Sequence, residues 1–237
     1  MNDASAVPGW PAGFRINPRR STLSPELIEA FRNVPAAHAS DCMGRPVGSV
    51  GLKAYHGFGQ MCGPALTVRI FPGDNLMIHK ALDVCQPGDI IVVDGGGDIA
   101  QCLIGGLMRC TALAKKVGGF VLAGAVRDIA EFADGKMPCY ARAHGHRGPS
   151  KNGPGEINVP IACAGMAVLP GDLMLGDGDG VICIPAADAE ALLPLVRAHA
   201  AKEDRIREAN LAGKTDSERL DALLREKGVP AELLKAR

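Results

Sequence analysis

The sequence predicts an α/β domain with a mixed, partly parallel sheet and a helical C-terminal tail. Two short apolar runs, Ile90–Val93 and Phe120–Ala123, are typical of buried strands. Between them, residues 100–117 carry apolar side chains at helical spacing, and Gly118 and Gly119 end that pattern. A strand–helix–strand unit implies parallel pairing with a right-handed crossover. The tail, residues 187–237, holds 20 of the 52 charged side chains and spaces Glu203 and Arg207 as a helical i,i+4 pair.

The other elements are predicted in chain order. Residues 1–20 are rich in Pro and Gly, which predicts an extended arm. The run Ser24-Pro25-Glu26 predicts the start of a helix, because Ser caps, Pro suits the first turn and an acid follows. The remaining elements are a strand at 65–71, a short helix at 74–84, a polar glycine-rich loop at 144–155, and strand segments at 156–163, 166–169 and 181–184. We therefore expect an arm (1–20), an α/β catalytic domain (21–186) and a tail (187–237).

Composition excludes several classes of protein. The 26 basic and 26 acidic side chains cancel, whereas binding to nucleic acid through phosphates needs a basic surplus. No apolar run approaches the roughly 20 residues of a membrane helix, so we expect no membrane partner. The N-terminus lacks the pattern of a secretory signal. The eight cysteines are dispersed and several lie in apolar runs, which predicts reduced core thiols in a cytoplasmic protein.

Two glycine-rich segments do not fit a nucleotide site. In Asp94-Gly95-Gly96-Gly97 the three glycines are consecutive, whereas a dinucleotide fingerprint needs G-x-G-x-x-G. Residues 176–180 are followed by a strand-like run, whereas a phosphate cradle needs a helix N-terminus. We interpret both segments as turns.

A charged pair, Arg127-Asp128, directly follows the second buried strand. Parallel sheets place ligand sites at the carboxyl ends of their strands. On one hypothesis Asp128 caps the next helix and Arg127 forms a structural ion pair. On the other, the Asp128 carboxylate holds a hard divalent cation and the Arg127 guanidinium binds an anionic substrate.

The spacing of Gly106, Arg127, Asp128 and Glu131 is G-x20-R-D-x2-E. Together with the ordered segments Pro87–Gly97, Pro170–Asp172 and Asp177–Val181, this pattern resembles the class II pyruvate aldolases that act on 4-hydroxy-4-methyl-2-oxoglutarate and 4-carboxy-4-hydroxy-2-oxoadipate. Those enzymes share a superfamily with the RNase E inhibitor RraA. The resemblance covers residues 24–186 and implies an RraA-like swivelling β/β/α domain.

The resemblance also implies roles for individual residues. It places Arg127, Asp128 and Glu131 in a catalytic centre, with Asp128 as the direct ligand of Mg²⁺ or Mn²⁺. It assigns the backbone amides of Gly105, Gly106, Leu107 and Met108, with Arg127, to the carboxylate of a small 2-oxo acid, and so implies that the helix begins nearer 103–105. A glutamate from the tail of a neighbouring subunit is implied to approach the metal through water; we assign Glu203, with Glu208 as the alternative.

The implied reaction is metal-dependent cleavage of a 4-hydroxy-2-oxo acid to pyruvate and a carbonyl compound, with oxaloacetate decarboxylation as a companion. The implied assembly is a homotrimer or hexamer with the tail at a subunit interface. Two alternatives stay open. The chain is instead a non-enzymatic RraA-type regulator of an RNA-degrading enzyme, although Glu131 favours the aldolase. The segment His144–Gly148 either binds a distal carboxylate or is a solvated loop, and we favour the loop.

Overall fold

The structure is a computed structural model that describes residues 11–19, 22–45, 47–214 and 216–234. It separates into two compact units, residues 1–196 and 197–237, and each is described by itself. The first ten residues of the predicted arm lie outside the described residues. Residues 14–16 of that arm do form a strand.

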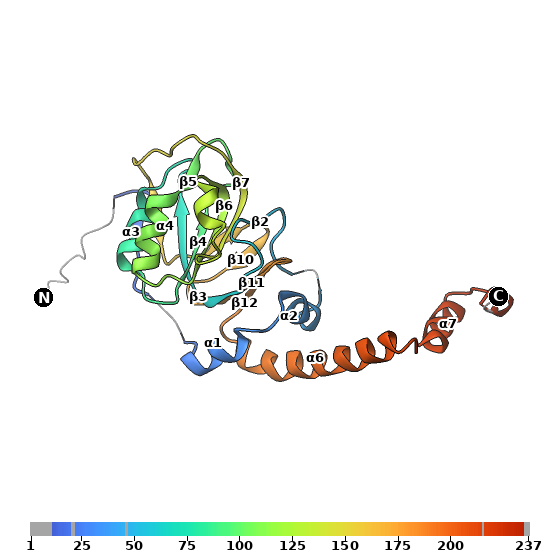
Figure 1. Cartoon of the computed structure of the whole chain (residues 1–237). Helices are drawn as coiled ribbons and strands as arrows, with labels where there is room; N and C mark the ends of the chain where they lie inside the picture. The colour runs from blue at the N-terminus through green and yellow to red at the C-terminus, as the bar shows by residue number, and fades with distance from the viewer. Residues whose placement is uncertain (1–10, 20–21, 46, 215, 235–237) are drawn as a thin grey trace, which may run out of the picture. The chain divides into compact units, whose positions relative to one another are not determined.

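Unit 1 is built on a large mixed sheet (Figure 1). Its main path runs β1-β8-β3-β4-β6-β7-β2; β5 pairs with β6, and β11 joins β3 to β12. The strands are β1 (Phe14–Ile16), β2 (Lys53–Ala54), β3 (Met61–Ile70), β4 (Ile90–Asp94), β5 (Cys102–Ile104), β6 (Gly119–Val126), β7 (Cys139–His144), β8 (Gly155–Ile157), β11 (Leu173–Asp177) and β12 (Gly180–Ile184). A separate hairpin contains β9 (Ile161–Cys163) and β10 (Met166–Val168).

The centre of the sheet is parallel, as the sequence predicts. Strand β4 pairs in parallel with β3 on one side and β6 on the other, and β6 pairs in parallel with β5 and β7. The strands β4 and β6 are buried along almost their whole length. This explains their unbroken apolar runs, because a parallel strand covered on both faces has no polar side.

Two layers cover this sheet. Helices α3 (Leu76–Val84) and α4 (Gly106–Ala114) lie side by side on one face (Figure 1) and close a core around Phe120. The β9–β10 hairpin packs on the other face. A third cluster lies between β11, β12, α1 (Pro25–Phe31), α2 (Ala36–Cys42) and the first turns of α6. The predicted cap of α1 is confirmed, since the Ser24 hydroxyl accepts the Leu27 N–H at 3.1 Å.

One predicted element was wrong. The helix expected from residue 100 begins only at Gly106, and Cys102–Ile104 form strand β5. These three consecutive apolar side chains are buried beside the end of β6, and a run this short does not distinguish a strand from a helix. The start at 103–105 implied by the resemblance was nearer.

The tail is helical, as predicted. Helix α6 spans Ala189–Leu211 and crosses the boundary between the units, and α7 spans Ser217–Glu226. Within the described part of unit 2, residues 197–214 and 216–234, no side chain is buried. Across the described chain, no helix combines the length and the hydropathy needed to cross a bilayer.

Candidate active site

The candidate site lies where β5 and β6 end. The pairing of these two strands stops at Ile104 and Val126, and the Arg127 N–H donates to the Ile104 carbonyl at 3.0 Å. From this edge β5 leads directly into α4, and β6 leads into the short helix α5 (Ile129–Phe132). The two segments that the resemblance singles out are therefore neighbours in space.

Asp128 stands at the first position before α5, but its side chain does not cap that helix. Its backbone is left-handed, with φ 57°, a conformation in which Asp is enriched among non-glycine residues. The carboxylate Oδ2 accepts the Gly106 N–H at 2.9 Å and lies 3.7 Å from Arg127 Nε. Since the side chain is 45 % exposed, Asp128 holds the start of α4 while keeping access to solvent.

Glycine is required at the start of α4 because two acids crowd it. A Cβ on Gly105 would lie 2.5 Å from Asp128 Oδ2, and one on Gly106 would lie within 2.5 Å of the Glu131 carboxyl group. The Leu107 and Met108 N–H groups open the helix, and neither donates to another described residue. The positive end of a helix and free amides favour an anion at this point.

A small cavity of about 100 Å³ adjoins this edge. Its volume is about that of three waters at roughly 30 Å³ each, far below the roughly 300–1,000 Å³ of drug-sized sites. It therefore suits an acid of a few carbons rather than a nucleotide. Its lining comprises Asn75, His79, Cys102, Leu103, Ile104, Gly105, Leu107, Met108, Arg127, Pro149 and Lys151.

The lining is positively charged. Arg127 and Lys151 contribute cations, and no carboxylate lines the cavity. Burial lowers the pKa of His79, and the nearby Lys151 ammonium lowers it further, so this imidazole is favoured in its neutral form. The Asn75 side chain, which also lines the cavity, is held in place because its Nδ2 donates to the Leu103 carbonyl at 2.9 Å. Charge and shape both favour a small anion.

The donor set fits a hard divalent cation. Mg²⁺ is typically held by one or two carboxylates, with waters completing its shell. Asp128 Oδ1 accepts no hydrogen bond from the described residues. The carboxyl group of Glu131, three positions after Asp128, lies close to Gly106. Two exposed carboxylates beside free amides are thus consistent with Mg²⁺ or Mn²⁺.

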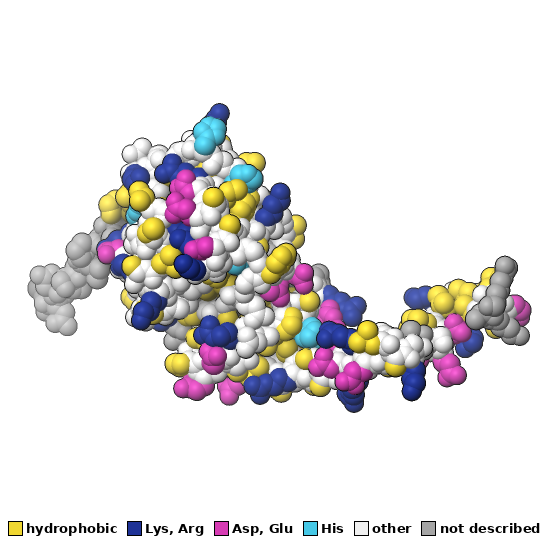
Figure 2. Space-filling model, viewed as in Figure 1, with side chains coloured by type: hydrophobic (Ala, Val, Ile, Leu, Met, Phe, Trp, Pro, Cys, Tyr) yellow, Lys and Arg dark blue, Asp and Glu magenta, His cyan; other side chains and the backbone are white. Residues whose placement is uncertain are grey.

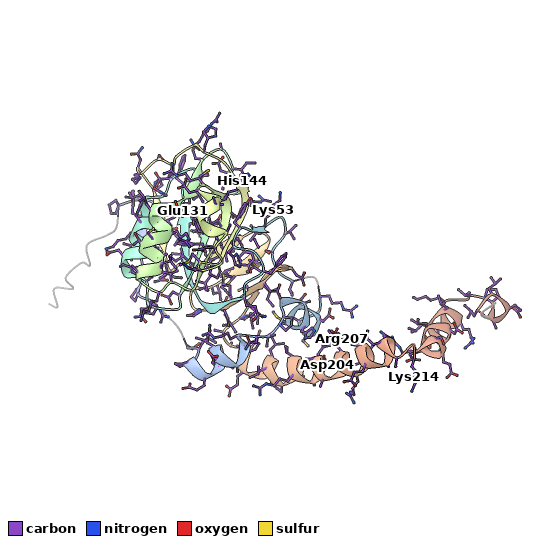
Figure 3. The ribbon with its side chains drawn as sticks, in the orientation of Figure 1. Lys53, Glu131, His144, Asp204, Arg207 and Lys214 are labelled. Atoms are coloured by element: carbon purple, nitrogen blue, oxygen red, sulfur yellow. The ribbon has the colours of Figure 1, made fainter. Side chains whose placement is uncertain are left out.

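Acidic and basic side chains lie next to one another at this end of unit 1 (Figure 2). Figure 3 labels Glu131 and His144, which both belong to the end where β6 and β7 finish. His144 does not line the cavity: its Nδ1 lies 3.3 Å from the Tyr55 hydroxyl. The backbone of Arg147 is tied to β5, as its carbonyl accepts the Cys102 N–H at 2.9 Å. His144 is the last residue of β7, and residues 145–148 form a loop.

Glu203 lies on α6 in unit 2, where its Oε1 is 3.1 Å from His199 Nε2. Glu208, the alternative, lies on the same helix. Because the two units are described separately, the predicted approach of either acid to the metal stays a prediction.

Among the cavity residues that the sequence did not assign, three carry nitrogen donors in their side chains: Asn75, His79 and Lys151. The sequence around His79 contains no motif that would assign it a role. Lys151 belongs to a loop whose path depends on distant contacts. The only sequence signal for Lys151 was its positive charge in a glycine-rich loop. That signal did not distinguish Lys151 from the neighbouring segment His144–Gly148 as a binder of an anionic group.

The chain is similar to known proteins of one family. Residues 32–183 match the RraA-like family, described as Aldolase/RraA. A "Putative 4-hydroxy-4-methyl-2-oxoglutarate aldolase" from Halalkalibacterium halodurans is 37 % identical over 169 residues, which cover 71 % of this chain and 80 % of the relative. The 4-hydroxy-4-methyl-2-oxoglutarate aldolase of Thermus thermophilus is 35 % identical over 133 residues, covering 56 % of this chain and 80 % of the relative.

A solved structure shows the same architecture. An unusual member of the RNase ES inhibitor RraA protein family from Streptomyces coelicolor superposes with a TM-score of 0.73 at 25 % identity, covering 80 % of this chain and 99 % of that one. The predicted α/β fold class, with its mixed sheet and C-terminal helix, is thereby confirmed. With a family match that covers most of unit 1 and a 37 % identical relative, the chain belongs to the RraA-like family.

Proposed function

We propose that this chain is a divalent-metal-dependent aldolase. It cleaves a 4-hydroxy-2-oxo mono- or dicarboxylic acid to pyruvate and a carbonyl compound, and decarboxylates oxaloacetate as a companion reaction. The names of the two aldolase relatives support this function. The dispersed free thiols support a cytoplasmic location, since reducing compartments keep cysteines unpaired.

The observation that carries the proposal is the arrangement around Asp128. An exposed carboxylate, an adjacent guanidinium and two free helix amides converge beside a small cavity without acidic lining. A 2-oxo acid presents a carboxylate and a carbonyl oxygen on adjacent carbons. The site offers the Arg127 guanidinium and the N–H groups at the start of α4 as partners for these two oxygen-bearing groups.

The chain's own groups divide the work. The amides of Leu107 and Met108 bind the substrate carboxylate, and Arg127 stabilises the negative charge that develops on the 2-oxo oxygen when the C3–C4 bond breaks. Asp128, with Glu131 beside it, would hold a divalent cation, and that cation would supply Lewis-acid stabilisation of the same developing charge. The C4 hydroxyl gives its proton to water as C4 becomes the carbonyl carbon of one product. The electron pair of the broken C3–C4 bond stays on the other fragment as the pyruvate enolate, which takes a proton from water at C3.

The test is an assay of pyruvate release. Purified full-length protein with Mg²⁺ or Mn²⁺ is offered 4-hydroxy-4-methyl-2-oxoglutarate and oxaloacetate, each with and without EDTA. Pyruvate release that requires the metal supports the proposal. Absence of pyruvate from both compounds with metal present rejects the aldolase function and leaves the fold unaffected.

The second candidate is a regulator of an RNA-degrading enzyme, which the likeness to the Streptomyces RraA-family structure favours. The two functions predict different outcomes. A regulator slows RNA cleavage by its partner enzyme and releases no pyruvate. An aldolase releases pyruvate and leaves the rate of RNA cleavage unchanged.

We further propose that the tail lies at the interface of a homotrimer or hexamer, where Glu203 approaches the neighbouring subunit's metal through water. The side chains of Leu220, Leu223 and Leu224 lie along α7, none of them buried, and an amphipathic helix is stabilised mainly by packing of its apolar face. Sedimentation equilibrium tests this: a trimer or hexamer is expected for the full chain, and a monomer contradicts it.

A further inference from the structure

Three acids follow β6 at regular intervals of three positions: Asp128, Glu131 and Asp134. The first two belong to the candidate site. The third lies two residues beyond the end of α5, and its Oδ1 accepts a hydrogen bond from Arg109 Nη2 on α4 at 2.5 Å. The row of acids that begins at the site therefore extends to a residue outside it, and this residue also contacts α4.

The two segments meet at two points with the same spacing. Gly106 and Arg109 are three positions apart on the buried face of α4, as residues with this spacing lie on one side of a helix. Glu131 and Asp134 are three positions apart on the other segment. The Glu131 carboxyl group lies close to Gly106, and Asp134 pairs with Arg109. The ion pair therefore lies about one turn of α4 away from the close approach at the site.

Arg109 is buried where the two segments pack together. Only 7 % of the residue is exposed, and its Cζ lies 5.9 Å from the centre of the fully buried Phe132 ring on α5. The hydrogen bond from Arg109 holds the pKa of Asp134 below its ordinary value, so both members of the pair are charged at neutral pH. In the described part of the chain, this is the only ion pair that links α4 to residues 127–136.

Stability of the fold gives a weak reason for an arginine at this position. Arg109 Nε is buried and has no acceptor among the described residues, and a buried donor without an acceptor costs free energy. Buried ion pairs can often be replaced by apolar side chains without loss of stability. The structure thus contains a costly group where an apolar one would pack, which points to a role in placing the neighbouring residues.

Helix α5 needs such placement because it is very short. It is a single turn of four residues, and it follows Asp128, whose backbone is left-handed. A helix of this length is not stable without contacts to the rest of the fold. The Arg109 guanidinium contacts both Phe132 within α5 and Asp134 just after it, so it fixes the turn that carries Glu131.

We propose that Arg109 and Asp134 are positioning residues, which hold α5 against α4 and thereby keep Asp128 and Glu131 in place for the divalent cation. This inference rests on the metal site of the proposed function. Neither residue lines the cavity, so both act through the two acids. Residues that orient metal ligands in this way typically change metal affinity about 10–100-fold when they are replaced.

The test measures Mn²⁺ binding to the full-length chain without substrate, from the electron paramagnetic resonance signal of free Mn²⁺. Arg109→Met and the milder Asp134→Asn are each expected to raise the Kd for Mn²⁺ at least about tenfold. The Tm of the metal-free variants is expected to fall by no more than about 2–4 °C, which shows that the fold is retained. Asp128→Asn is expected to abolish binding, which identifies the measured site.

Lys136→Met is the matched control. Lys136 Nζ lies 3.7 Å from Asp134 Oδ2, and its side chain is 73 % exposed. This variant removes a cation beside the same acid but leaves the link to α4 intact, so the Kd for Mn²⁺ should not change. The double variant Arg109→Met/Asp134→Asn should lose no more affinity than the weaker-binding single variant, because the losses of a pair that acts as a unit do not multiply.

Unchanged Mn²⁺ affinity in folded Arg109→Met and Asp134→Asn overturns the inference. An equal loss in Lys136→Met overturns it too, and so do losses that multiply in the double variant. Because binding is measured without substrate, its outcome is separate from that of the aldolase assay. A wild type that binds Mn²⁺ but releases no pyruvate overturns the aldolase function alone, whereas a wild type that binds no Mn²⁺ overturns both.

Discussion

Two kinds of acidic motif occupy turns in this fold, and they use their carboxylates in opposite ways. The first kind is the repeated Pro-Gly-Asp turn, which ends in Asp89 before β4 and in Asp172 before β11. Each carboxylate is almost fully buried, with 1 % and 5 % exposure. Each accepts the N–H of the residue three positions earlier, at 2.9 Å and 2.8 Å. The glycines between have φ near 90°, at 87° and 89°, which only glycine adopts readily.

The second kind is the Arg127-Asp128 pair. Its carboxylate is 45 % exposed, and only Oδ2 accepts a hydrogen bond from the described residues. The Pro-Gly-Asp carboxylates use both oxygens on protein donors, so they hold turns. Asp128 Oδ1 accepts no hydrogen bond from the described residues, so this oxygen remains available to a cation. The two kinds of acid therefore differ in whether both carboxylate oxygens accept hydrogen bonds from protein donors.

The largest effect on activity is expected from a substitution of Asp128, the exposed acid of this comparison. Asp128→Asn keeps an acceptor for the Gly106 N–H and suits the left-handed backbone, but removes the charge that holds a cation. We expect kcat/KM for pyruvate release to fall by at least about 10²–10³-fold, while the free energy of unfolding changes by less than about 1 kcal/mol. Steady-state kinetics and urea unfolding measure the two quantities. A stable variant with near-normal activity would assign Asp128 to the structural kind.

The next effect concerns Gly106. In Gly106→Ala the new methyl group overlaps the Glu131 carboxyl group, so the start of α4 and its free amides must shift. We expect about a hundredfold loss of kcat/KM, since displacements of about 1 Å cost that much at an active site. The matched control is Gly59→Ala, where the nearest atom to the new methyl is 3.5 Å away. Equal losses in the two variants would refute the role of this close approach.

A stability effect is expected at Asp172. In Asp172→Ala the N–H groups of Leu169 and Ala186 lose their acceptor. A buried donor left unsatisfied costs about 1–3 kcal/mol, and for a chain of this size about 1 kcal/mol lowers Tm by about 2–4 °C. Calorimetry should therefore show a clear drop in Tm, while kcat/KM of the folded protein is retained. A loss of activity at unchanged Tm would contradict the assignment of Asp172 to the turn.

The smallest effect is a pH dependence at Asp74. Its pKa is held below the ordinary value near 3.8 by hydrogen bonds that outweigh burial. A carboxyl group with a lowered folded-state pKa contributes stability above its unfolded-state pKa, and this contribution is lost as the pH falls through the folded-state value. The stability difference between wild type and Asp74→Asn should therefore be larger at pH 7 than below pH 3. Urea unfolding at both pH values measures it, and a difference independent of pH would show that the charge of Asp74 is not involved.

The sequence predicted the parts of this molecule whose information is local. The strands β4 and β6 are unbroken apolar runs, the Ser24 cap acts within one helical turn, and Arg127-Asp128 follows its strand directly. Each depends on neighbours in the chain, so pattern and spacing were sufficient.

What depends on distant contacts was not predictable. Strand β5 is a strand because β6 lies beside it, and its three residues carry no periodicity of their own. Lys151 reaches the cavity because Asp74, 77 positions earlier, holds its loop. Likewise, Asp128 and Gly106 meet across 22 positions, and only the resemblance to a family had linked them.

The most direct test of the central claim, that the Asp128 site forms a pyruvate enolate, is exchange of the pyruvate methyl protons in D₂O followed by proton NMR. Enolate formation is reversible and needs no carbonyl partner, so exchange reports this step alone. The metal-loaded wild type should exchange the methyl protons, and both EDTA and Asp128→Asn should stop the exchange, while Asp172→Ala should retain it. Absence of exchange in the metal-loaded wild type, or undiminished exchange in Asp128→Asn, would contradict the account.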